Sequence, residues 1–139
     1  MKKPLHTLSR RMLAEDGQSA AEFALVAPIL LVLVLGAIQF GMAFNTWVTL
    51  TDAARAGARK AIVARFNGGS TSDAVQAVRD SASSLDQANL AVSVTDPQWN
   101  TPGSEVTVTA SYPYSINIPL LGISVASGNL TATSKEELE

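Results

Sequence analysis

The longest apolar pattern in this 139-residue chain lies near its N-terminus. Residues 23–44 carry no formally charged side chain, and Gln39 is the one clearly polar residue among them. As a helix rising about 1.5 Å per residue, this run would extend roughly 33 Å, which is enough to cross the hydrocarbon core of a bilayer. The pattern therefore predicts a transmembrane helix at about residues 23–44.

The helical pattern continues past the apolar run and brings small side chains onto one face. Ala53, Gly57 and Ala61 recur at every fourth position, which places them on the same side of a helix. A face of such small residues permits close approach of another element. Two interpretations stay open: the face packs against another subunit or a membrane partner, or it packs beneath the sheet of the chain's own domain.

Further candidate contact residues lie on the same long helix. Ala37 and Gly41 are two small residues four positions apart, a spacing that can mark a contact between membrane helices. Arg55 and Arg59 flank the small-residue face. Asp52, three residues before Arg55, predicts a local solvated ion pair.

The region after residue 66 predicts a small α+β domain. The stretch Asn67–Ser70 contains two glycines, which favour the end of the long helix and a turn. An apolar stripe at helical spacing then follows, and it predicts a second helix that ends near Asp86 and Gln87.

The hydrophobic period changes to two after the second helix. It predicts strands at about residues 90–94, 106–112 and 128–134. In the second strand, Val106, Val108 and Ala110 share one face. The expected fold class is α+β: a long N-terminal transmembrane helix extending into a small domain with a short helix and about three antiparallel strands.

Two connecting segments complete this outline. Residues 96–103 contain two prolines and a glycine and are expected to form a loop. Residues 116–125 are interpreted as an irregular apolar segment rather than a regular strand. Within it, residues 118–121 either cover an open edge of the core or form a tip that binds a partner.

A basic leader precedes the apolar run and ends at Gly17. Its Lys and Arg residues also fit an ordinary secretory signal, which is one alternative. Against that alternative, the apolar run exceeds the roughly 7 to 15 residues of a secretory h-region, and no clean A-x-A site closes it. The other interpretation is cleavage between Gly17 and Gln18, before the apolar run.

Glu22 stands one residue before the apolar run, where an ionised carboxylate is costly unless it is paired. Cleavage after Gly17 on the cytoplasmic side would create an ammonium group on Gln18 and make Glu22 the fifth mature residue. In a stack of such helices, the ammonium of one subunit could neutralise Glu22 of its neighbour. Because lipid strengthens such a pair relative to water, the expected consequence is a fixed axial register.

These residues together carry a family resemblance. The Gly17/Gln18 junction, Glu22-Phe23 and residues 24–31 resemble the class III signal of type IV pilins and pseudopilins. More narrowly, residues 22–26 with Pro28, Gly36, Gly41 and residues 52–59 are similar to TadE-like proteins of the tight-adherence (Flp) pilus system. One departure is Phe23, where major Flp pilins usually carry tyrosine.

The resemblance implies an inner-membrane pseudopilin or minor pilin that contributes to assembly of Flp-type pili. Residues 1–17 would be a cytoplasmic leader removed by a prepilin peptidase, residues 18–66 the N-terminal helix, and residues 67–139 the exported domain. Implied partners are that peptidase, other pilins or pseudopilins, the inner-membrane assembly platform and the lipid bilayer. The alternative function is an uncleaved single-pass anchor whose exported domain binds an envelope partner.

Pro28 lies early in the apolar helix and removes one backbone hydrogen bond there. A kink or soft spot near this end would help a subunit that leaves the bilayer for a filament. A membrane proline that its neighbours tolerate is the alternative.

Charge does not orient the chain by itself. Four Lys or Arg residues precede the span and four follow it within about twenty residues, so the positive-inside comparison is a tie. The resemblance implies a cytoplasmic leader and an outer domain. Removing the leader takes away four basic and two acidic residues, so the formal net charge changes from −2 to −4.

The residue types do not favour catalysis or nucleic-acid binding. The chain has no cysteine, and its one histidine, His6, lies in the leader. There is also no glycine-rich phosphate loop after a strand, and the sequence pI is near 5.3. We therefore expect no enzyme activity, no cofactor or metal, and no nucleic-acid partner.

Overall fold

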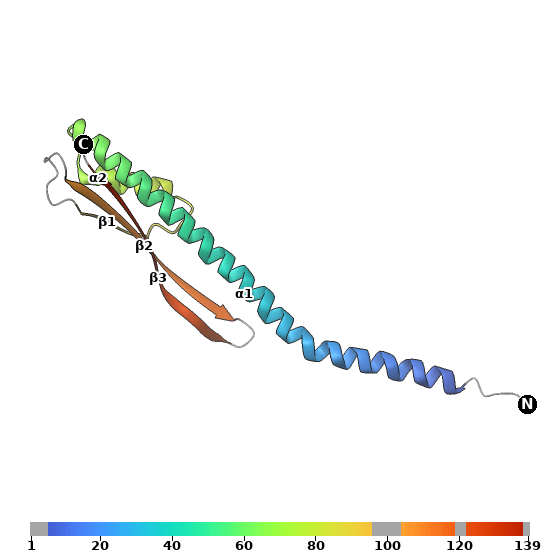
Figure 1. Cartoon of the computed structure of the whole chain (residues 1–139). Coiled ribbons are helices and arrows are strands. Elements are labelled where there is room, and N and C mark those ends of the chain that lie inside the picture. The colour runs from blue at the N-terminus through green and yellow to red at the C-terminus, as the bar shows by residue number, and fades with distance from the viewer. Residues whose placement is uncertain (1–5, 96–103, 119–121, 138–139) are drawn as a thin grey trace, which may run out of the picture. The chain divides into compact units, whose positions relative to one another are not determined.

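The computed structural model describes residues 6–95, 104–118 and 122–137 (Figure 1). Its elements are the helices α1 (His6–Phe66) and α2 (Thr71–Ser81) and the strands β1 (Ala91–Thr95), β2 (Glu105–Ile118) and β3 (Ile123–Glu137). The strands form one antiparallel sheet in the order β1-β2-β3. The predicted α+β class is confirmed. The expected loop at residues 96–103 and most of the apolar stretch at residues 118–121 lie outside the described residues.

The chain divides into two compact units between Ile38 and Gln39. Unit 1 comprises the first part of α1. Unit 2 contains the remainder of α1 together with α2 and the sheet.

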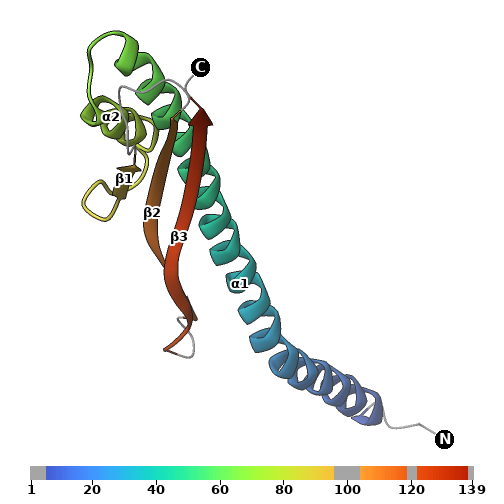
Figure 2. The same ribbon diagram turned by 60° about the vertical axis from the view of Figure 1, so that its left-hand side comes forward.

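In unit 2, α1 and α2 pack on one face of the sheet, as Figure 2 shows. Many of the buried residues are alanine, and the largest fully buried side chains are Leu50, Val78, Val106 and Val108. Val106, Val108 and Ala110 point into this core, as their alternation predicts. Small side chains let the helices approach the sheet closely.

The connection between the helices follows the glycine signal in the sequence. Gly68 adopts φ 71°, a conformation that glycine reaches at little cost, and the Gly69 N–H donates to the Ala64 carbonyl at 2.6 Å. Asp73 Oδ2 then accepts the Ser70 N–H at 2.8 Å, at the start of α2. The end of the long helix near residue 66 is thereby confirmed.

The predicted end of the second helix was wrong, because α2 stops at Ser81 rather than near residues 86–87. A turn replaces the last expected helical turn, with the Leu85 N–H donating to the Ala82 carbonyl at 2.9 Å. Gln87 Nε2 donates to the carbonyls of Ala82 and Leu85. These side-chain bonds satisfy carbonyls that a continuing helix would have used, so they favour the turn.

The expectation of an irregular apolar segment at residues 116–125 was also wrong for most of that segment. Strand β2 extends to Ile118 and β3 begins at Ile123, so the two form a long hairpin. The register shifts by one residue after Ile116, which pairs with Ala126, whereas Asn117 pairs with Ser124. Val125 is therefore the extra residue of a β-bulge, and it interrupts the alternation from which strands are recognised.

Candidate functional site

The Gly17–Gln18 junction lies on an exposed stretch of α1. No atom of another element lies within 4 Å of the position that a Cβ on Gly17 would take. Packing in this fold therefore does not require a glycine here. The side-chain amide of Gln18 donates a hydrogen bond to Glu22 Oε1 at 3.1 Å, about one helical turn further on.

Glu22 and Phe23 are both exposed on unit 1, and the Phe23 side chain is 69% accessible. Within the described residues, the ion pairs join Asp52 to Arg55 and Glu105 to Lys135, so Glu22 has no basic partner there. An acidic group at the front of an apolar helix is costly in lipid without a counter-charge. The pairing of Glu22 with the N-terminus of a neighbouring subunit stays a prediction.

In the described part of unit 1, no other element covers the apolar helix. Its large exposed side chains are Phe23, Leu25, Val26, Ile29, Leu30, Leu31, Leu33, Val34 and Ile38. The helical stretch Gly17–Ala64 is long and apolar enough to include a membrane span, and none of its most apolar window is buried. The helix runs unbroken through Pro28. A soft spot at Pro28 stays a prediction.

The small-residue face of α1 packs inside the chain's own domain, which is the second of the two interpretations. Ala53 and Ala61 are fully buried, and Gly57 is buried between them. A Cβ on Gly57 would overlap Val78 Cγ2 of α2 and lie 3.2 Å from Val108 Cγ1 of β2. This face is therefore occupied by α2 and the sheet and is not open to another subunit.

The remaining predicted contact residues are exposed. Arg55 and Arg59 lie on the outer side of α1, and Arg55 pairs with Asp52 at 3.7 Å, as the spacing predicts. Ala37 and Gly41 are also exposed, and a Cβ on Gly41 would meet nothing within 4 Å. A helix contact at Ala37 and Gly41 stays a prediction.

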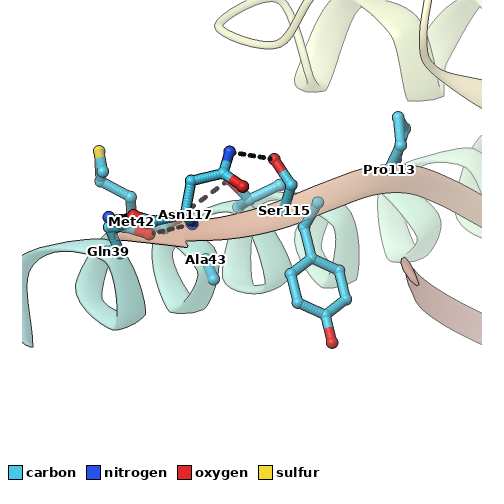
Figure 3. A pocket seen from close by; sticks show the side chains of 8 residues that line it. Gln39, Met42, Ala43, Pro113, Ser115 and Asn117 are labelled. Carbon is cyan, nitrogen blue, oxygen red and sulfur yellow. Dashed lines mark hydrogen bonds between the residues drawn. The ribbon is translucent and has the colours of Figure 1, made fainter. Parts of the chain in front are cut away.

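One contact of the site was not expected from the sequence: Gln39 binds the backbone of Asn117 near the end of β2 (Figure 3). Gln39 Oε1 accepts the Asn117 N–H at 2.8 Å, and Gln39 Nε2 donates to the Asn117 carbonyl oxygen. The side-chain amide thus offers one acceptor and one donor, as an adjacent strand would. As the one clearly polar residue of the apolar run, Gln39 could have been recognised in the sequence as needing a hydrogen-bond partner. Nothing in the local pattern identifies that partner, which lies 78 residues away.

A groove adjoins this contact on unit 2. Its volume is about 330 Å³, and Gln39, Met42 and Asn117 are among the residues that line it. Asn117 Nδ2 also donates to Ser115 Oγ at 3.3 Å, across the exposed face of β2 (Figure 3). Within the residues that the structure describes, no group of three or more potential metal-ligating side chains gathers.

An exposed ion pair between Glu105 and Lys135 lies at the other end of the hairpin. Lys135 Nζ donates to Glu105 Oε1 at 2.6 Å, and this hydrogen bond holds the pKa of the Glu105 carboxyl below its usual value. Both side chains are well exposed, so the pair is a surface feature of the strand ends.

An exposed apolar helix followed along the chain by a small α+β unit is consistent with a membrane-anchored, pilin-like protein. Residues 17–59 match the family model described as TadE-like protein, and this match confirms the resemblance noted in the sequence. The similarity to this family extends from the Gly17 junction through Arg59. No curated protein and no solved structure matches the chain.

Proposed function

We propose that this chain is a pseudopilin or minor pilin that contributes to assembly of Flp-type pili after cleavage between Gly17 and Gln18. The observation that carries the proposal is the position of Gly17 and Glu22. Both are exposed at the start of an apolar helix, within the segment that matches the TadE-like family. Neither has a packing role in the described structure that would otherwise account for it.

In this proposal a prepilin peptidase removes residues 1–17 on the cytoplasmic side. The cut creates an ammonium group at Gln18, one helical turn from Glu22. The ammonium of one subunit then neutralises Glu22 of the next, where lipid or neighbouring helices exclude water and strengthen the attraction. Unit 2 lies on the outer side of the inner membrane, and other pilins and the assembly platform are the partners of the helix.

The alternative is an uncleaved single-pass anchor whose outer domain binds a cell-envelope partner. The observation that favours it is the continuity of α1, which begins at His6 and passes through the Gly17 junction without a break. A peptidase would have to bind the junction as a helix or unwind it first.

The test is the intact mass and N-terminal peptide of membrane-extracted protein, from the native host and from cells that lack a prepilin peptidase. A chain starting at Gln18 in the host and a full-length chain in the deficient cells would support the pseudopilin. A chain that keeps its leader in both strains would refute processing and leave the static anchor. A cut after the apolar run would refute both and indicate a secreted domain.

A further inference from the structure

One end of unit 2 lacks charge. The sequence has no Asp, Glu, Lys, Arg or His between Glu22 and Asp52, and none between Glu105 and Lys135. Because β2 and β3 are antiparallel partners, with Glu105 opposite Glu137, the charges of the hairpin gather at its open end. The opposite end of the hairpin, where Ile118 pairs with Ile123, is its closed end. This closed end and the turns of α1 between Glu22 and Asp52 have no charged side chain.

The same end of unit 2 presents aromatic and aliphatic side chains. Phe40, Phe44 and Trp47 of α1 are 67%, 54% and 44% exposed. The rings of Phe44 and Trp47 lie 5.9 Å apart between centroids. These three residues line a groove of about 240 Å³ with Ala43, Tyr114, Ile116 and Leu130. Trp and Tyr are typical of the membrane–water interface, where an apolar ring and a polar group are both accommodated.

The position of Gln39 sets the depth of the hairpin end. Gln39 lies five residues before the end of the apolar run at Phe44, which is roughly 7.5 Å along the helix. Asn117 is hydrogen-bonded to Gln39, so a span that reaches Phe44 carries the hairpin end to a similar depth. Interfacial elements commonly lie about 5–10 Å into the boundary between head groups and acyl chains.

The backbone at this end is adapted to a setting with little water. Strand β1 pairs with β2 only as far as Ser111, so no strand among the described residues pairs with the rest of that edge. The Gln39 amide satisfies both backbone groups of Asn117, and Pro113 has no N–H to satisfy. On β3 the bulge residue is Val125, an apolar side chain that is 59% exposed.

We propose that the closed end of the β2–β3 hairpin, with Phe40, Phe44 and Trp47, lies in the outer interface of the bilayer that α1 crosses. The occupant of this surface is lipid, because the surface is uncharged and follows directly from the apolar helix along the chain. The inference rests on the membrane insertion assumed in the proposed function. A subunit that leaves the bilayer would then have to release the hairpin as well as the helix.

The test uses the full chain in phosphatidylcholine–phosphatidylglycerol vesicles. Since the chain has no cysteine, single substitutions carry one environment-sensitive fluorophore each. Val125→Cys reports on the hairpin end. Thr133→Cys is the matched control, because Thr133 is also exposed on β3 but lies near the charged end. Leu31→Cys reports on the apolar helix. Iodide quenches from water, and phospholipids with a shallow or a deep spin label quench from the bilayer.

We expect iodide to quench the Val125 label less than it quenches the Thr133 label. The shallow lipid label should quench the Val125 label more than the Thr133 label. If the Val125 and Thr133 labels respond alike while the Leu31 label is quenched by the deep lipid label, the hairpin inference fails and the anchor stands. If the Leu31 label is also quenched by iodide, membrane insertion itself fails. A Val125 label shielded from both quenchers, with energy transfer that grows with protein density, would identify a second copy as the occupant and overturn the proposal.

Discussion

Two stretches of the same helix are both apolar, but they differ in side-chain size and in exposure. In unit 1, the side chains after Glu22 are large and exposed, as at Leu25, which is 76% accessible. Between Ala53 and Ala64 in unit 2, the buried side chains are alanine, and they lie against α2 and the sheet. Large apolar side chains that a fold leaves exposed are stable only in an apolar environment supplied from outside the chain, whereas small buried ones permit close packing within it. The first stretch is therefore a candidate membrane span, and the second is part of the core of unit 2.

The largest effect is expected at Gly17, in the exposed stretch of α1, where a substitution should change function without changing the fold. Substituting Gly17 with valine should abolish cleavage, because the proposed peptidase requires a glycine at this position. The fold should not change, because no packing in this structure depends on Gly17. The measurement is the intact mass of the membrane-extracted variant. Gly36→Val is the control, since Gly36 also has open space around it and lies beyond the junction. Equal processing of the two variants would contradict a role for Gly17.

Glu22 tests whether unit 1 acts through charge. Glu22→Ala should leave cleavage intact and strongly reduce piliation, because the proposed ammonium partner on the neighbouring subunit loses its counter-charge. Pili on the cell surface are counted by electron microscopy, with processing checked by mass. Glu22→Asp keeps the carboxylate and should piliate better than Glu22→Ala. Normal piliation of the alanine variant would exclude charge pairing as the basis of register.

Gly57 tests the packing role of unit 2. Gly57→Ala should destabilise this unit by about 1–3 kcal/mol, because the added methyl overlaps Val78 and crowds Val108. Gly41→Ala makes the same change on the same helix, with open space around the new methyl. The free energy of unfolding in detergent, measured with urea, compares the two variants. If both variants are equally stable, close packing at Gly57 is not what holds α1 to the sheet.

Gln39 is the first residue of unit 2, between the two stretches in the sequence, and its removal should loosen only the hairpin end. Gln39→Leu eliminates two hydrogen bonds to Asn117 and should cost about 0.5–1.5 kcal/mol per bond. Hydrogen exchange should speed up at the Asn117 amide and stay unchanged at Val108. Asn129→Ala, at an exposed amide side chain of the same hairpin, is the control and should leave Asn117 protected. Unchanged exchange in Gln39→Leu would show that the contact does not hold the strand.

The smallest effect is expected for the exposed pair Glu105–Lys135. Because the pKa of Glu105 is lowered in the folded protein, its contribution to stability is present above the usual glutamate value of about 4.3. That contribution is lost as the pH falls through the lowered pKa. Lys135→Met should move the pKa of Glu105 upward in an NMR titration, and high salt should weaken the shift. A titration that Lys135→Met leaves unchanged would exclude Lys135 as its cause.

Several features of the fold could be predicted from local pattern. The end of the long helix followed from the glycine pair at residues 68–69, and the inward face of β2 followed from alternation at Val106, Val108 and Ala110. The end of α2 could not be predicted, because Gln87 bonds backward to carbonyls at Ala82 and Leu85. The full hairpin was also missed, since the bulge at Val125 breaks the period of two.

The sequence by itself determined the apolar run, the Gly17 junction with Glu22 beside it, and the α+β class, because each depends on neighbouring residues. Only the tertiary structure decided what the small face at Gly57 contacts, since the pattern is the same for an internal and an external partner. It also decided that Gln39 binds Asn117 across 78 residues. Contacts of this kind depend on how distant segments meet in space, and no local periodicity encodes that meeting.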